Sequence, residues 1–151
     1  MGLVQSYHYE VEIERSPEEV RAVFLDMDAY PEWFEYWHYD LSETKKQAVD
    51  LKKGEHLNCI YRGSGIRCVV SENTPQAFRF WGGVRGIFKA HHMVYFEPSQ
   101  VTKGGTKFIL HEDFSGLFSF TVSKRPNDLT FTYSEFNKEL KKRVESRPIT
   151  K

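Results

Sequence analysis

Residues 16–33 read SPEEVRAVFLDMDAYPEW, and this stretch decides how the chain must be folded around it. Ser16 is a typical N-cap residue, Pro17 suits the first position of a helix, and Glu19 completes a capping box with Ser16. The apolar residues that follow at helical spacing are Val20, Val23, Phe24 and Met27. The stretch therefore predicts a short helix with one buried face.

The same stretch leads into a second, strongly aromatic segment, DAYPEWFEYWHYD at 28–40. Asp28 is a suitable cap for a second short helix, with Pro31 inside its first turn. We expect this helix to carry Trp33 as a structural plug. Trp37, one turn further on, is expected to reach a ligand.

Strand patterns flank the two predicted helices. Before them, residues 6–14 alternate apolar and polar side chains. Tyr7, Tyr9, Val11 and Ile13 share one face, which is typical of a half-buried antiparallel strand. After them come six strand-like stretches separated by short turns that contain Gly or Pro: HYDLSE, EHLNCIYR, IRCVVSEN, AFRFWGG, IFKAHHMVYFE and TKFILHEDFSG. The pattern predicts an antiparallel meander of about seven strands in total. The GGVRG segment at 82–86 is expected to form a turn or bulge.

A long helix is predicted near the end of the chain, opened by Pro126. Its buried stripe consists of Leu129, Tyr133, Phe136, Leu140 and Val144. Because a single sheet must cover its apolar face, this helix is expected to pack across the sheet. The fold class is α+β, and residues 1–151 are expected to form one domain.

Composition narrows the functional classes. Lys+Arg and Asp+Glu both number 21, so the formal net charge is 0 and generic binding to nucleic acid or an anionic membrane loses its main driving force. No apolar run reaches the about 18 residues of a membrane span, and the beginning of the chain lacks the pattern of a secretory signal. We expect a cytoplasmic protein without stable membrane insertion.

The order of elements and several motifs resemble the Bet v 1/START-like superfamily (SRPBCC), specifically its small polyketide cyclase/dehydrase-like domains. The motifs are SPEEVRAVFLDMDAYPEW, FRFWGG, HMVYFEP with GGTKFILHEDFSG, and FNKELKKRVE. The resemblance covers about residues 5–146 and implies the helix-grip fold, in which a curved sheet, two short helices and a long C-terminal helix enclose an apolar cavity. Val94 stands where the family usually has Phe, which could widen the cavity locally.

His92 and Glu112 are the candidate catalytic residues. On the two strands at 87–97 and 106–116 they share the inward face, and the loop length places them opposite or one step apart. Because an unpaired buried carboxylate is costly, we expect the two side chains to pair. Three roles stay open: a pair that braces the sheet, a pair that contacts a ligand, or an acid–base pair with His92 as the proton carrier.

Twelve residues are expected to contact the ligand. They are Trp37, Tyr61, Phe80, Trp81, Phe88, His92, Val94, Phe108, Leu110, Glu112, Phe136 and Leu140. Phe80 and Trp81 alternate on one strand, so only one of them can face the interior, and the sequence leaves open which one.

The remaining histidines and the cysteines are expected to have no catalytic role. His8, His91 and His111 are predicted on the outer face; His91 and His111 could meet across a hairpin, but a third metal ligand is missing, so no metal site is predicted. Cys59 and Cys68 flank a turn and could bond, although two free thiols fit an intracellular protein better.

Three functions follow. The first is binding of a small hydrophobic or aromatic metabolite in the cavity, without a cofactor, with His92, Glu112 and Tyr61 as polar anchors. The second is a cyclase, dehydratase or isomerase acting on a polyketide-like intermediate in the same cavity. The third is an interaction protein with a collapsed cavity. The identity of the ligand and the oligomeric state are not readable from the sequence.

Overall fold

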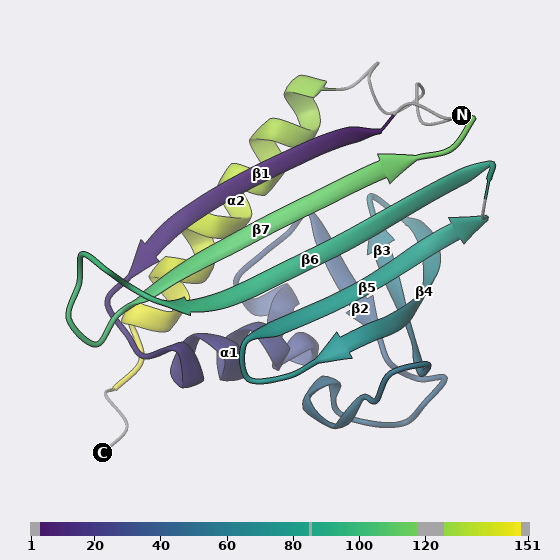
Figure 1. The fold of residues 1–151 in the computed structure, drawn as a ribbon. Helices are drawn as coiled ribbons and strands as arrows, with labels where there is room; N and C mark the ends of the chain where they lie inside the picture. Colours follow the sequence, from purple (N-terminus) through teal and green to yellow (C-terminus); the bar gives the residue numbers. More distant parts are fainter. Residues whose placement is uncertain (1–3, 85, 118–125, 149–151) are drawn as a thin grey trace.

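The computed structural model of the chain describes residues 4–84, 86–117 and 126–148 (Figure 1). Its elements are β1 (Gln5–Ile13), α1 (Pro17–Leu25), the 3₁₀ helix η1 (Met27–Glu32), β2 (Trp37–Asp40), the 3₁₀ turn η2 (Ala48–Asp50), β3 (His56–Tyr61), β4 (Ser64–Asn73), β5 (Ala77–Val84), β6 (Phe88–Pro98), β7 (Thr106–Ser115) and α2 (Pro126–Glu145). The predicted order of one strand, two short helices, six strands and a long helix is confirmed, with η2 as an addition.

The strands form one antiparallel sheet in the order β1-β7-β6-β5-β4-β3-β2. Figure 1 shows this sheet curled around α2, which runs along its concave side, while α1 lies at one end of the sheet. A bulge at Val70–Glu72 shifts the register between β4 and β5, and such bulges bend a strand. The sheet therefore forms a half-barrel that holds the long helix.

The start of α1 has the predicted cap. The Ser16 hydroxyl accepts a hydrogen bond from the backbone N–H of Glu19 at 3.2 Å, and the Glu19 carboxylate accepts one from the backbone N–H of Ser16 at 3.1 Å. Val20, Val23 and Phe24 are buried on the inward face of the helix, as predicted.

The second predicted helix is wrong in type and length. The chain forms a 3₁₀ helix that ends at Glu32, without a side-chain cap, and Trp37 is the first residue of β2. Pro31 explains the difference, because it has no N–H for an α-helical hydrogen bond and disfavours the α conformation at Tyr30. Trp37 is consequently placed by the sheet, opposite Tyr61 on β3.

Aromatic side chains fill the core between α1, the sheet and α2. Phe24 packs its ring against those of Phe78, Phe96, Phe108 and Phe136, at centroid distances of 5.7–6.1 Å. Such pairs contribute beyond the apolar area that they bury. They anchor α2 over one end of the half-barrel.

The GGVRG segment is only partly a turn. Gly82 and Gly83 are paired residues of β5, opposite Ala90 and Lys89 of β6. Gly83 has a φ of +113°, and a Cβ there would lie 2.1 Å from the carbonyl oxygen of Phe88. This strand end therefore requires glycine because the β6 backbone approaches it closely.

Candidate functional site

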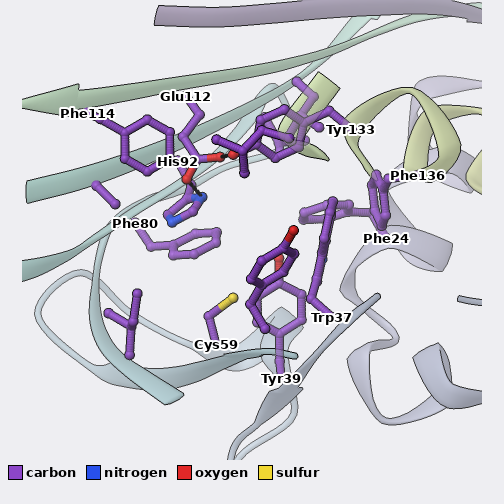
Figure 2. Close-up of a pocket in the computed structure, with 16 residues that line it drawn as sticks. Phe24, Trp37, Tyr39, Cys59, Phe80, His92, Glu112, Phe114, Tyr133 and Phe136 are labelled. Atoms are coloured by element: carbon purple, nitrogen blue, oxygen red, sulfur yellow. Dashed lines mark hydrogen bonds and ion pairs between the residues drawn. The ribbon is translucent and has the colours of Figure 1, made fainter. Parts of the chain in front are cut away.

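A cavity of about 130 Å³ lies between the concave face of the sheet and α2 (Figure 2). Its walls are mostly aromatic and aliphatic, and its floor is the core around Phe24. Eight of the residues predicted to contact a ligand line it: Trp37, Tyr61, Phe80, His92, Val94, Leu110, Glu112 and Phe136. Alternation along the strands placed Tyr61, His92, Val94, Leu110 and Glu112 on the correct face, and the helical stripe placed Phe136.

The other four predicted contacts do not line the cavity. Trp81 points to the outer face, where the Lys89 ammonium lies 4.7 Å from its ring centroid. Phe80 is the inward residue of that strand, with 1% of its surface exposed.

Phe88 packs against Phe114 near the end of the hairpin. Phe108 and Leu140 are fully buried in the core, and the Phe108 ring packs against the lining residues Phe24 and Phe136.

Eight further lining residues were not predicted as ligand contacts: Phe24, Tyr39, Cys59, Ile66, Ala90, Phe114, Leu129 and Tyr133. For four of them the sequence pattern already indicated an inward-facing side chain. Ala90 and Phe114 share the inward parity of His92 and Glu112, and Leu129 and Tyr133 belong to the apolar stripe of α2. Tyr39 lies on a strand of only four residues, which is too short to show a period.

His92, Glu112 and Tyr133 form the polar cluster of the cavity. His92 and Glu112 are directly opposite in the register of β6 and β7, and Nδ1 of His92 lies 2.8 Å from Oε1 of Glu112. The Tyr133 hydroxyl, from α2, donates a short hydrogen bond to Oε2 of Glu112. Both oxygens of this carboxylate, which is 2% exposed, are thus paired with a donor. The prediction that the two strand residues pair is confirmed in geometry.

The other ring nitrogen of His92 is free. Because Nδ1 faces a carboxylate, it carries the proton, and Nε2 of the neutral ring presents a lone pair. The ring is held flat on Phe80, with centroids 4.6 Å apart and planes inclined by 14°. Nε2 makes no hydrogen bond to another described residue, and the side chain is 17% exposed. His92 therefore offers the cavity an oriented acceptor, or a base whose conjugate acid Glu112 would stabilise.

Burial changes the acidity of other groups in the wall. Desolvation, followed by the Glu112 charge, raises the pKa of Tyr133 well above its usual value. Desolvation likewise raises the pKa of the Tyr39 hydroxyl and of the Cys59 thiol. These three groups stay protonated near neutral pH, so they are weak polar contacts and not bases or nucleophiles.

Trp37 forms part of the wall opposite His92 (Figure 2). Its ring stacks on Phe136 with centroids 4.8 Å apart and lies 4.5 Å from Phe34. Its indole N–H is buried and has no hydrogen-bond partner among the described residues. An unpaired buried donor is uncommon in a folded protein.

Tyr61 is placed near the first turn of α2, where its hydroxyl donates to Asp128 at 3.3 Å. Arg62, at the β3–β4 turn, forms an ion pair of 2.6 Å with the same carboxylate. Tyr61 thus lines the cavity with its ring, while its hydroxyl helps to fasten the β3–β4 hairpin to α2. The Tyr61 hydroxyl was predicted to be a polar contact for the ligand, but it instead donates to Asp128 and so connects the hairpin to α2.

The outer-face histidines lie as predicted, but with other partners. His111 pairs across the sheet with His8, with their Nδ1 atoms 3.0 Å apart, while His91 is opposite Asp113. Among the described residues, no group of three or more His, Cys, Asp or Glu side chains could hold a metal.

Cys59 and Cys68 are both free thiols. The register of β3 and β4 sets Cys59 opposite Ile66 and Leu57 opposite Cys68, so the two cysteines do not face each other directly. The two cysteines are offset by two residues, because the turn is centred between Arg62 and Gly63, one residue earlier than direct opposition of the cysteines would require.

A curved antiparallel sheet that grips a long helix around an aromatic cavity defines the Bet v 1-like, helix-grip class of proteins. The family model described as polyketide cyclase/dehydrase and lipid transport matches residues 4–146, and the chain belongs to this family. No helix within the described part of the chain is long and apolar enough to cross a membrane.

Solved structures agree on the fold. Truncated norcoclaurine synthase from Thalictrum flavum has a TM-score of 0.68 at 12% identity, with 97% of each chain covered. Ara h 8.0201 has a TM-score of 0.68 at 12% identity, covering 96% of this chain and 100% of its own. CV1439 from Chromobacterium violaceum has a TM-score of 0.67 at 13% identity, covering 94% and 99%. No curated protein matches the sequence.

Proposed function

We propose that this protein binds a small hydrophobic or aromatic molecule in the cavity between the sheet and α2. The observation that carries the proposal is an internal cavity of about 130 Å³ with mostly apolar walls and one convergent polar cluster, which is the usual composition of a small-molecule site. Membership in a family that includes lipid transport supports it. The two free thiols fit a reducing compartment, and we place the protein in the cytoplasm.

Thermal denaturation with small apolar probes tests the proposal. A molecule that binds only the folded chain raises the melting temperature, and the increase grows with its concentration. Val94→Phe is the matched control, because Val94 is 1% exposed in the cavity wall and the larger ring fills the space. We expect one-ring probes such as benzene or toluene to stabilise the wild type and not Val94→Phe. Equal behaviour of the two proteins, or no stabilisation at all, would contradict the proposal.

Native mass spectrometry of protein purified from its own host is an independent test. A carried ligand should appear as a discrete mass increment that disappears on denaturation. In Val94→Phe the increment should be lost while the protein remains folded.

A second candidate function is acid–base catalysis in the same cavity, and the His92–Glu112 geometry favours it specifically. His92 Nε2 would take a proton from a carbon next to a carbonyl group, leaving an enolate, and the imidazolium would be stabilised by Glu112 at 2.8 Å. Return of the proton to oxygen or carbon would complete an isomerisation, or would prepare a ring closure or loss of water. This places His92 in the role of acid–base in a cyclase, dehydratase or isomerase.

Deuterium exchange tests this second function without knowledge of the substrate. Acetophenone, which has one ring and an exchangeable methyl group beside a carbonyl, would be incubated with the protein in D₂O and followed by NMR. We expect the wild type to accelerate exchange and His92→Gln to lose the acceleration while still binding the probe. Identical rates in the two proteins would leave the binding function and remove the catalytic one.

A further inference from the structure

The size of the cavity and the chemistry of its lining favour one class of small apolar ligand over others. This inference rests on the proposed binding function and specifies the class of ligand. Three properties of the site carry it: its volume, the absence of cations from its lining, and the hydrogen-bond groups left unpaired within it.

Volume limits the ligand to about one ring. The cavity measures about 130 Å³. An engineered apolar cavity of about 150 Å³ takes up a single benzene molecule. A long acyl chain or a multi-ring skeleton would need α2 or the β3–β4 hairpin to move outward, so the observed shape fits a one-ring compound.

The charge of the lining disfavours anions. None of the described lining residues is a lysine or arginine, and Glu112 contributes a buried carboxyl group. Arg62, beside Tyr61, is already paired with Asp128 at 2.6 Å. A ligand carboxylate would lose its hydration without gaining a cationic partner, and it would lie close to a group of the same charge. Aromatic and fatty acids in their ionised forms are therefore poor ligands.

The unpaired groups select a hydrogen-bond donor. Each Glu112 oxygen already accepts from one donor, His92 Nδ1 or the Tyr133 hydroxyl, and the Glu112 side chain is only 3% exposed, so little of it is within reach of a ligand. The acceptor that remains in this cluster is His92 Nε2, and the stacked Phe80 fixes the direction of its lone pair. A ligand hydroxyl that donates to Nε2 satisfies it, whereas an ether or a plain hydrocarbon leaves it unpaired.

We infer that the cavity selects a neutral one-ring ligand that carries a hydroxyl donor for His92 Nε2, and that it rejects carboxylates. The specificity comes from an arrangement in which Glu112 orients His92 but is itself almost fully covered, whereas the His92 side chain is 17% exposed. Glu112 and Tyr133 are thus positioning residues, and His92 is the contact.

Four matched probes test the inference on the wild-type protein at pH 7: phenol, anisole, toluene and benzoate. Each is one ring with one substituent, and affinities can be measured by isothermal calorimetry and by the increase in melting temperature. We expect phenol to bind about fivefold to tenfold tighter than anisole, because anisole has the oxygen but no donor. Benzoate should show no binding at concentrations that saturate with phenol.

The variant His92→Phe/Glu112→Gln removes the acceptor without leaving an unpaired buried carboxylate. In this variant we expect the ratio of phenol to toluene affinity to fall about fivefold to tenfold, while toluene still binds. Phenol and toluene differ in hydration free energy by the same amount for both proteins. Comparing the affinity ratio of the variant with that of the wild type therefore cancels this difference. If the variant does not fold, the phenol–anisole and phenol–benzoate comparisons on the wild type still decide the matter.

The outcomes separate this inference from the function on which it rests. If toluene and anisole bind as well as phenol, or if benzoate binds, the inference is wrong and the cavity is still a binding site. If none of the four probes binds and Val94→Phe behaves as the wild type does, the proposed function itself fails.

Discussion

His92 and Glu112 face each other directly across β6 and β7, and their side chains meet on the concave face with Nδ1 and Oε1 2.8 Å apart. Tyr133 donates to the other oxygen of the same carboxylate from α2. This cluster therefore connects the sheet to the helix at the same place where it presents one free acceptor to the cavity. The cluster that we expect to stabilise the fold is therefore also the one that we propose as the ligand contact.

Glu112→Ala should be strongly destabilising. Removing the carboxylate leaves His92 Nδ1 and the Tyr133 hydroxyl unpaired in a buried site, which costs about 3 kcal/mol in the free energy of unfolding. Urea denaturation measures this. Glu97→Ala, on an exposed position of β6, is the control and should change stability by no more than about 0.5 kcal/mol. Equal effects of the two substitutions would show that the buried cluster does not stabilise the fold.

Trp37→Phe should weaken ligand binding more than it weakens the fold. A phenyl ring preserves the stacking on Phe136, so the stability loss should stay below about 1.5 kcal/mol. The substitution removes the unpaired indole N–H and part of the cavity wall. Trp33→Phe is the matched control, because Trp33 also packs on Phe136 but does not line the cavity. Titration with phenol should detect a loss of affinity only for Trp37→Phe; a loss of the same size for Trp33→Phe would contradict the assignment.

Stability should decline at alkaline pH. Burial raises the pKa of Cys68 to about 12, whereas an unfolded thiol titrates near pH ~8.5. Above that pH the unfolded chain releases a proton that the folded chain retains. The contribution of the Cys68 thiol to the free energy of unfolding is therefore constant below about pH 8. Between there and pH ~12 it falls by up to ~1.4 kcal/mol per pH unit. The raised pKa values of Tyr30, Tyr39 and Tyr133 add to the decline above about pH 10.

Urea denaturation at pH 8, 9 and 10 checks this dependence, with Cys68→Ala as the comparison. The variant lacks the thiol, so its stability should fall less steeply than that of the wild type. Parallel curves would mean that Cys68 ionises equally in the folded and unfolded chains.

Asp128→Ala should change the rates of ligand exchange more than the stability. Asp128 joins α2 to Tyr61 and Arg62 of the β3–β4 hairpin, and the ion pair is partly exposed, so its loss should cost no more than about 1 kcal/mol. Without it the hairpin and the helix can separate more readily. Stopped-flow fluorescence with phenol should show faster association and dissociation, with a smaller change in affinity. Glu43→Ala removes another partly exposed ion pair, with Arg67, and should leave both rates unchanged.

Much of the site was predictable because period-two alternation fixes which residues of a strand share a face. His92, Val94, Leu110 and Glu112 were placed on the inward face in this way, and the register confirmed the pairing of His92 with Glu112. Alternation could not decide between Phe80 and Trp81, because both parities of that strand carry large aromatic rings. Packing against Lys89 on the outer face settled the orientation of Trp81.

The errors lie where neighbouring elements override the local pattern. Trp37 reads as a helical residue in the sequence, but Pro31 ends the helix and pairing with β3 draws Trp37 into a strand. Phe108 and Leu140 have the correct parity and the correct helix face, yet they do not line the cavity, because its extent depends on where α2 crosses the sheet. Tyr133 was recognised as buried, but its bond to Glu112 depends on the same crossing.

By itself, the stretch SPEEVRAVFLDMDAYPEW determined the capped helix and the break after it, since capping and helical spacing act over a few residues. The order of elements along the whole chain determined the fold class. Alternation also determined which strand side chains face inward, except on the strand that carries Phe80 and Trp81. Only the tertiary structure decided that His92 and Tyr133 both pair with the buried Glu112 carboxylate, leaving Nε2 of His92 as the open acceptor of this cluster. That outcome depends on contacts between residues far apart in the chain, whose distances are set by how the long helix lies in the curved sheet.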